Sequence, residues 1–380
     1  MKTAFAAAAA GAFAAALLGC GNTYFTDWRP SYYHELIRVG DPQNEVGARS
    51  LALGGAGRAG LYEPAAAVSN PAALAFIRRP SVSMGGGYYS RILTVQPGEE
   101  DPRAEASSGS FAPSFAAGVL PVAGGKVVLG GAAWVPNDYA YRLGKGAGNE
   151  IKSTGTLYAV GPTAATRWGP FALGFGADYL LGAQNLSFPP RDAAAGSYRS
   201  GGYDVRGAIM ARGEAAPGWT VAACAFGRKG AALNVTGARS FDLTLPPAAG
   251  AALGVTYGHI AVYGDYIYTF YDMMRTGEPT IAAVLGSVVY PVGWGMAGAE
   301  YTTAGGAVAR AGVAYRPWFI QYANGSKPVS LRYAMGGGWP LAGKRGRLDA
   351  ALSYGRRGAL TPDGYLVDEL ELALSFNYFW

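Results

Sequence analysis

After residue 80, apolar and polar side chains alternate with a period of two residues, and this rhythm limits the possible folds most strongly. In residues 366–380 the even positions are apolar, with Asp368 the exception, and the odd positions from 369 to 377 are small or polar. An α-helix would mix these two sets, whereas a β-strand separates them onto opposite faces. The same rhythm recurs in residues 171–181, 329–335 and 347–355. We therefore predict an all-β fold.

Turns rich in Gly, Pro, Asn and Asp separate the alternating segments, and short turns coexist with longer polar links such as residues 96–110 and 356–365. This combination is typical of transmembrane antiparallel β-barrels, whose strand number is even in single-chain bacterial examples. We predict about fourteen strands in such a barrel, give or take two because residues 231–245 and 275–292 are ambiguous. The expected strands start near Ser81, Phe111, Lys126, Thr154, Phe171, Ser197, Trp219, Ala248, Ile260, Trp294, Ala307, Val329, Arg347 and Leu366.

The composition favours a membrane environment over water. Half of the residues are hydrophobic and only 15% are charged, against about 25% charged residues in soluble proteins. Beyond the N-terminal segment, no apolar run approaches the roughly 20 residues that a spanning helix needs. A soluble β-sandwich also alternates, but it hides its apolar face between two sheets. Such a fold has no need for the exposed aromatic ending at residues 376–380, which suits a membrane interface.

The N-terminus has the features of an export signal. Lys2 precedes an apolar stretch at residues 4–18, which is too short to span a membrane. We therefore expect residues 1–19 to be a signal peptide. The sequence LLGC at residues 17–20 resembles the lipobox of bacterial lipoproteins, which implies lipidation of Cys20; the alternative is an ordinary signal with a cysteine nearby by chance. If Cys20 is acylated, Cys224 has no disulfide partner, because the chain has only two cysteines.

Residues 20–79 lie outside the regular repeat and are expected to form a periplasmic or plug segment before a barrel at residues 80–380. Residues 63–68 are rich in alanine, with Pro64 suited to a first helical turn. Asn70 precedes Pro71, and a residue before proline avoids helical angles. A short helix is therefore predicted to end at this point.

Two patches of sequence resemble a known family. The segments GARSLALGGA at residues 47–56 and AAAVSNPAAL at 65–74 are similar to the N-terminal hatch of FadL-like and TodX-like transporters. In that family an Asn-Pro-Ala motif, here Asn70, Pro71 and Ala72, lies in a plug inside a fourteen-stranded barrel. AGAEY at 297–301 and RAGVAY at 310–315 also resemble its C-terminal strands.

The resemblance implies a bacterial outer-membrane channel for passive uptake of hydrophobic compounds such as long-chain fatty acids, with no cofactor. The expected partners are outer-membrane lipid and a hydrophobic small molecule. The final strand, which ends in Trp380, resembles the signal that the barrel-assembly machinery recognises. The chain is short for such a transporter, and a lipobox is not typical of the family. A PorV-like barrel that binds exported proteins in a secretion system, or a structural barrel, is therefore the alternative.

Several charged residues fall on the face opposite the large apolar side chains and are expected to point into the lumen. Arginine or lysine on the lipid face costs about 2 to 4 kcal/mol at the bilayer midplane, which favours the inward direction. These side chains either pair with each other or contact a ligand head group, and arginine suits a carboxylate. The candidate ligand-binding residues are Arg310, Arg332, Arg347, Glu300 and Asp265.

Other function classes lack support in the sequence. The net charge of +6 is spread along the chain without the basic block that grips nucleic acid. Two histidines, His34 and His259, and two cysteines leave little material for a metal or catalytic site. Residues 55–60 match G-x-G-x-x-G, but the strand and helix that a dinucleotide fold requires around this motif are missing. We predict that the protein is not an enzyme and that these glycines serve tight packing.

Overall fold

The structure is a computed structural model of the 380-residue chain. It describes residues 46–95, 104–138, 141–143, 151–187, 196–237, 240–276, 290–319, 329–341, 345–358 and 365–380. The predicted signal peptide, Cys20 and His34 lie outside these residues.

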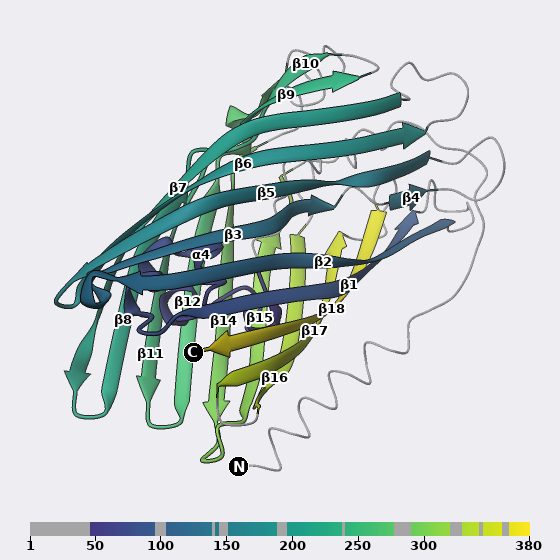
Figure 1. The fold of residues 1–380 in the computed structure, drawn as a ribbon. Coiled ribbons are helices and arrows are strands. Elements are labelled where there is room, and N and C mark those ends of the chain that lie inside the picture. The colour runs from purple at the N-terminus through teal and green to yellow at the C-terminus, as the bar shows by residue number, and fades with distance from the viewer. Residues whose placement is uncertain are drawn as a thin grey trace.

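A single antiparallel sheet closes on itself. The strand β1 (Ser81–Val95) pairs with β2 (Ala104–Val122) on one side and with β18 (Tyr365–Phe379) on the other. The sheet therefore has no free edge, and all of its strands follow each other around the barrel in chain order (Figure 1). The remaining strands are β3 (Val127–Asp138), β4 (Tyr141–Leu143), β5 (Ile151–Trp168), β6 (Phe171–Ser187), β7 (Gly196–Ala216), β8 (Trp219–Arg228), β9 (Ala232–Gly237), β10 (Phe241–Thr244), β11 (Ala248–Tyr257), β12 (Ile260–Thr269), β13 (Arg275–Thr276), β14 (Val292–Thr302), β15 (Val308–Pro317), β16 (Val329–Pro340) and β17 (Gly346–Gly358).

In the part of the chain that the structure describes, these segments make fourteen strands, as predicted. Four strands are interrupted and consist of the pairs β3 and β4, β8 and β9, β10 and β11, and β12 and β13. The described residues of the ambiguous stretch 231–245 include β9 and β10, which pair with each other. Residues 277–289 of the other ambiguous stretch lie outside the described residues.

The outer face of the barrel is apolar. Large side chains such as Phe175, Tyr203 and Ile209 are 61%, 73% and 59% exposed, although they sit in the middle of strands. Water-soluble monomers rarely expose apolar patches above a few hundred Å², so this belt is built for lipid. The structure confirms the predicted transmembrane β-barrel.

Aromatic residues mark one rim of that belt. Exposed rings lie beside the short turns and at the C-terminus, and Trp219 stacks on Tyr257 with ring centroids 4.5 Å apart. Aromatic rings favour the membrane–water interface, and short turns face the periplasm in outer-membrane barrels. We therefore refer to this rim as the short-turn end. Its exposed aromatic residues include Trp168, Trp219, Tyr257, Tyr301, Trp339 and Trp380.

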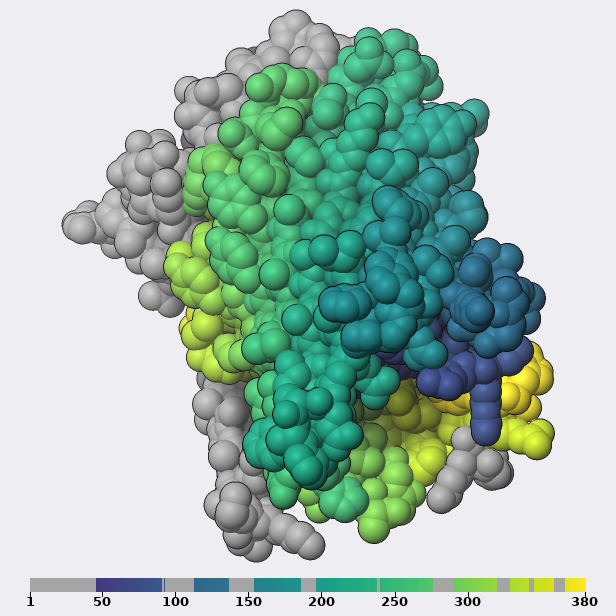
Figure 2. Space-filling model, turned by 90° about the vertical axis from the view of Figure 1, so that its left-hand side faces the viewer, coloured from purple at the N-terminus to yellow at the C-terminus, as the bar shows by residue number. Residues whose placement is uncertain are grey.

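Residues 46–77, here called the internal segment, lie inside the barrel. This segment contains α3 (Ala48–Ala52), η2 (Arg58–Gly60), α4 (Ala66–Ser69) and η3 (Pro71–Phe76), and nearly all of its residues are buried. The helix α3 contacts β15 to β18, whereas η3 contacts β3, β5, β6 and β7 across the lumen. Seen toward the short-turn end, purple atoms of the N-terminal part fill the hollow between teal and yellow strands (Figure 2). No described helix has the length and apolar character to cross a membrane.

Glycines on the inner wall allow the internal segment to approach closely. A Cβ atom at Gly312 would overlap the backbone of Leu53, and one at Gly298 would lie 2.8 Å from the Leu53 carbonyl oxygen. On the opposite wall, a Cβ at Gly174 would overlap the backbone of Pro71 and Ala72. The wall and the segment are thus packed backbone against backbone at two places.

Candidate functional site

One ion-pair network ties the internal segment to the wall. Arg49 in α3 donates to Glu300 on β14 at 3.1 Å, and Arg310 on β15 donates to the same carboxylate oxygen at 2.6 Å. Arg310 also contacts Asp349 at 2.7 Å. Lone buried charges are costly, whereas a network with matched partners is tolerated. The described residues of this network are Arg49, Glu63, Tyr263, Glu300, Arg310, Arg347, Asp349 and Asn377.

Asp265 on β12 forms a second anchor. Its carboxylate accepts hydrogen bonds from the backbone N–H groups of Gly57 and Arg58 at 3.0 and 3.2 Å, and from the Arg58 guanidinium at 3.0 Å. The Asp265 side chain is fully buried. Gly57 has a positive φ of 103°, which favours glycine because it lacks a Cβ atom. This turn of the internal segment is therefore fixed to the wall by three hydrogen bonds.

The Asn-Pro-Ala motif is buried where α4 ends and η3 begins. The Asn70 amide donates to the carbonyl of Arg58 at 2.8 Å, so it links two turns of the segment. Asn70 also ends α4, close to the predicted helix end. Arg206 on β7 donates to the Ala67 carbonyl at 2.8 Å and forms an ion pair with Asp178 on β6. These contacts hold the motif against β6 and β7.

Arg332 belongs to a third cluster, within the wall. Its guanidinium contacts Glu369 at 3.1 Å and Glu371 at 3.4 Å on β18. The structure thus places all five candidate ligand-binding residues on the inner face, each with a partner of opposite charge. A ligand role for these five residues stays a prediction.

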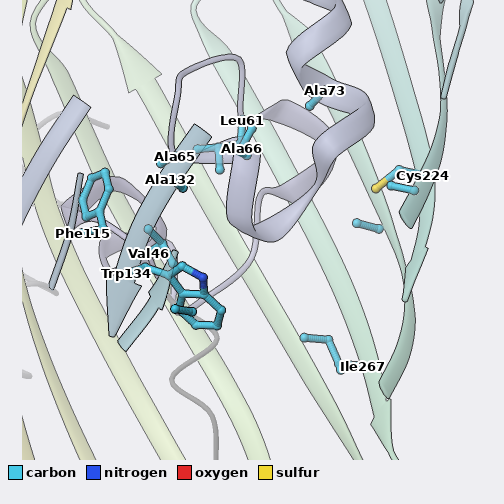
Figure 3. Packing of buried hydrophobic residues seen from close by; sticks show 14 of the residues in the cluster. Val46, Leu61, Ala65, Ala66, Ala73, Phe115, Ala132, Trp134, Cys224 and Ile267 are labelled. Carbon is cyan, nitrogen blue, oxygen red and sulfur yellow. The ribbon is translucent and has the colours of Figure 1, made fainter. Parts of the chain in front are cut away.

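A mostly apolar pocket of about 60 Å³ lies between the internal segment and the wall. A water molecule needs roughly 10 to 15 Å³ by this kind of measure, so the pocket has room for only a few small groups. Figure 3 shows the indole of Trp134 and the side chain of Ile267 below the helical turns of the segment (Figure 3). The lining residues are Arg58, Val68, Ser69, Pro71, Trp134, Asp178, Asp204, Arg206, Gly207, Phe226, Gly227, Arg228, Ala248 and Ile267.

The described hydrogen-bonded pairing between two wall strands, β2 and β3, ends beside this pocket. Pairing between β2 and β3 runs from Val122 and Val127 to Phe115 and Trp134, and the described residues show no β2–β3 pairing beyond. β2 itself stays paired with β1 as far as Ala104. The register between β3 and β5 shifts just after Trp134, where Pro136 has no N–H to donate to the sheet. Trp134 lines the pocket, so one side of the pocket lies beside the point where the described β2–β3 pairing ends.

Nothing in the sequence pattern indicated that Trp134, Phe226 and Ile267 line a pocket. The one local signal was Pro136, since proline within a strand indicates a bulge or an edge.

Chemistry-bearing residues elsewhere are dispersed. Among the described residues, no group of three His, Cys, Asp or Glu side chains could hold a metal ion. His259 is exposed in the turn between β11 and β12, 6.3 Å from the ring of Tyr301. Cys224 is a buried, free thiol on β8.

These features define the class: a closed, fourteen-stranded transmembrane barrel with a folded segment anchored in its lumen. No family model matches the sequence, and no curated protein matches it. Several solved structures, however, are similar to this chain. A FadL homologue from Pseudomonas aeruginosa is 15% identical with a TM-score of 0.62, covering 88% of this chain and 98% of that one.

The toluene transporter TodX from P. putida is 14% identical with a TM-score of 0.63, covering 89% of this chain and 99% of that one. The toluene transporter TbuX from Ralstonia pickettii is 16% identical with a TM-score of 0.59, with 89% and 99% covered. The predicted resemblance to FadL-like and TodX-like proteins is therefore confirmed for the fold. The folds that it resembles are those of transport channels, not of enzymes.

Proposed function

We propose that the protein is an outer-membrane channel for the passive uptake of hydrophobic compounds. The observation that carries this proposal is the apolar pocket beside the end of the β2–β3 ladder. We infer that a compound leaves this pocket through the wall at that point, because a water-insoluble molecule needs a route into the membrane. No energy source is required, because the compound moves down its own gradient.

The size of the pocket indicates that the internal segment moves during passage. Ligand pockets for small organic molecules usually have about 300 to 1,000 Å³, and this pocket has about 60 Å³. Val68, Ser69 and Pro71 form its inner side, so a shift of α4 and η3 would enlarge it. The proposed cargo includes long-chain fatty acids and monoaromatic hydrocarbons; similar folds occur in a FadL homologue and in the monoaromatic hydrocarbon channel CymD.

The location follows from the same proposal. The apolar belt contacts outer-membrane lipid, and a signal peptide at residues 1–19 would direct export. Lipidation of Cys20 remains part of the proposal and is tested by mass spectrometry of the mature N-terminus.

Uptake by cells that lack their own transporter of this kind tests the function. We expect expression of the chain to increase uptake of a labelled fatty acid or toluene. Val68→Trp should reduce that uptake severalfold, because the larger ring fills the pocket. Val160→Trp is the matched control, since Val160 is 48% exposed on the outer face. Uptake at the level of empty cells, or equal uptake by both variants, would contradict the proposal.

The dense ion-pair network favours a second candidate, a PorV-like or structural barrel. A lumen crossed by Arg49, Glu300, Arg310 and Asp349 is rigid on that side. Recovery of exported proteins bound to the barrel, with no change in hydrophobic uptake, would support this alternative.

A further inference from the structure

Four exposed cations gather on one side of the short-turn end. Two of them follow the internal segment and directly precede β1, one ends the turn η4 (Ala123–Gly125) between β2 and β3, and one directly precedes β17. We call this group the basic arc; its members are Arg78, Arg79, Lys126 and Arg345.

Backbone hydrogen bonds place two members of the basic arc on either side of β18. The Phe379 N–H donates to the Arg345 carbonyl at 2.7 Å. The Trp380 N–H donates to the Pro80 carbonyl at 3.1 Å, and Arg79 directly precedes Pro80. The backbones of Arg345 and Arg79 are therefore about two strand spacings apart, or about 10 Å.

The β2–β3 turn continues the arc on the other side of β1. Ser81, the first residue of β1, lies opposite Val119 on β2. β2 ends at Val122, and Lys126 lies at the end of the turn that follows. The basic arc therefore covers the part of the rim where the first and the last strand close the sheet.

The rim is positively charged on this side only. The turns on the opposite side, β7–β8, β11–β12 and β14–β15, contain no Lys or Arg. Around the basic arc, the carboxylate of the final residue, Trp380, is the negative group that the sequence provides. The neighbouring stretches without any Asp or Glu are residues 76–84, 118–130, 340–348 and 375–380.

Aromatic rings indicate the level of the basic arc relative to the membrane. Trp380 and Trp339 are exposed at the same rim, at the ends of the neighbouring strands β18 and β16, and Trp168 is exposed at the end of β5. Tryptophan favours the level of the lipid headgroups. Long cationic side chains beside these rings extend their charged ends to that level, so the arc lies within reach of lipid phosphates.

We propose that the basic arc binds phospholipids whose headgroup carries a net negative charge, in the periplasmic leaflet of the membrane. A phosphate between Arg79 and Arg345 lies within one Debye length of both, about 8 Å at physiological ionic strength. Arginine also donates paired hydrogen bonds to phosphate oxygens. Zwitterionic headgroups are disfavoured, because the cations repel their ammonium group. This inference rests on the barrel lying in a membrane and not on the uptake of hydrophobic compounds.

Native mass spectrometry of the purified full-length protein in non-ionic detergent tests the proposal. The probes are phosphatidylglycerol and phosphatidylcholine with identical acyl chains. We expect about tenfold stronger retention of phosphatidylglycerol, because each cation near a lipid phosphate adds attraction, and a decrease of this preference as salt is added.

Matched double variants locate the effect on the surface. Arg79→Gln combined with Arg345→Gln should lower the preference from about tenfold to about twofold, because it removes the flanking pair of cations. Arg199→Gln combined with Arg275→Gln removes the same charge from exposed residues of β7 and β13, at the long-loop end. This control should retain the full preference.

Several results would overturn the proposal. Equal retention of the two lipids by the unaltered protein would do so, as would an unchanged preference in the Arg79 and Arg345 variant. An equal loss in both double variants would show an effect of net charge alone and would remove the arc as the site. Tighter binding of free glycerol phosphate, or of a soluble acidic peptide, than of phosphatidylglycerol would overturn the assignment to a lipid.

A labelling experiment covers the case in which the arc variant does not fold. Phosphatidylglycerol with a photo-crosslinker in its headgroup should label the unaltered protein in peptides that contain Arg79, Lys126 or Trp380. Labelling confined to peptides of the long-loop end would overturn the site.

Discussion

Arg58 donates to Asp265 through both its backbone N–H and its guanidinium, at 3.2 and 3.0 Å. The two residues are 207 positions apart in sequence and both are buried. One carboxylate on β12 therefore holds a turn of the internal segment in place and pairs with the positive charge of Arg58. Because the same turn carries the carbonyl that binds Asn70, this contact also positions the Asn-Pro-Ala motif.

Asp265→Asn should destabilise the protein strongly. Removal of one partner of a buried ion pair costs about 3 to 5 kcal/mol, since the other charge stays buried and unpaired. We expect a lower melting temperature and faster proteolysis within the internal segment. Asp242→Asn is the control, because Asp242 is exposed on β10, where its carboxylate accepts a hydrogen bond from the Asn234 amide at 3.4 Å. A melting temperature for Asp265→Asn equal to that of the control would show that the anchor contributes little.

Gly312→Ala should displace the internal segment from the wall. The added Cβ overlaps the backbone of Leu53, and such overpacking typically costs about 1 to 3 kcal/mol. Gly264→Ala on β12 adds the same methyl group where no atom lies within 4 Å. Thermal unfolding of the two variants side by side measures the effect. Equal stability would mean that the segment adjusts without strain.

The alternation of side chains was sufficient to locate most of the wall. The strands β8, β11, β12 and β16 begin at the predicted residues, because a lipid-facing side and a wet side require a strict period of two. β2 begins at Ala104, seven residues before the expected Phe111. Residues 104–110 read AEASSGS, a small and polar sequence with the composition of a loop.

The candidate site could be predicted only in part from the sequence. The inward direction of Glu300 and Arg310 follows from their position on alternating strands. The contact of Glu300 with Arg49, 251 residues away, depends on how the internal segment turns inside the lumen. No local pattern carries that information.

Glu300→Gln should weaken the attachment of α3 to the barrel wall more than it destabilises the wall itself. Arg310 keeps Asp349 at 2.7 Å, whereas Arg49 loses the carboxylate that it contacts at 3.1 Å. We expect the guanidinium of Arg49 to become accessible to arginine-modifying reagents while the barrel stays folded on gels. Glu214→Gln, at an exposed position on β7, is the control. Unchanged labelling of Arg49 would show that other contacts are enough to hold α3.

Removal of Trp380 should reduce assembly of the barrel in the membrane. The Trp380 backbone N–H donates to the Pro80 carbonyl at 3.1 Å, next to the β1–β18 pairing that closes the sheet. The terminal aromatic residue is also the proposed contact for the assembly machinery, so its loss affects both recognition and closure. We expect severalfold less heat-modifiable, folded protein in outer-membrane fractions. Trp339→Ala alters another exposed tryptophan at the same end and should assemble normally; an equal loss in both variants would indicate a general need for aromatic residues at the interface.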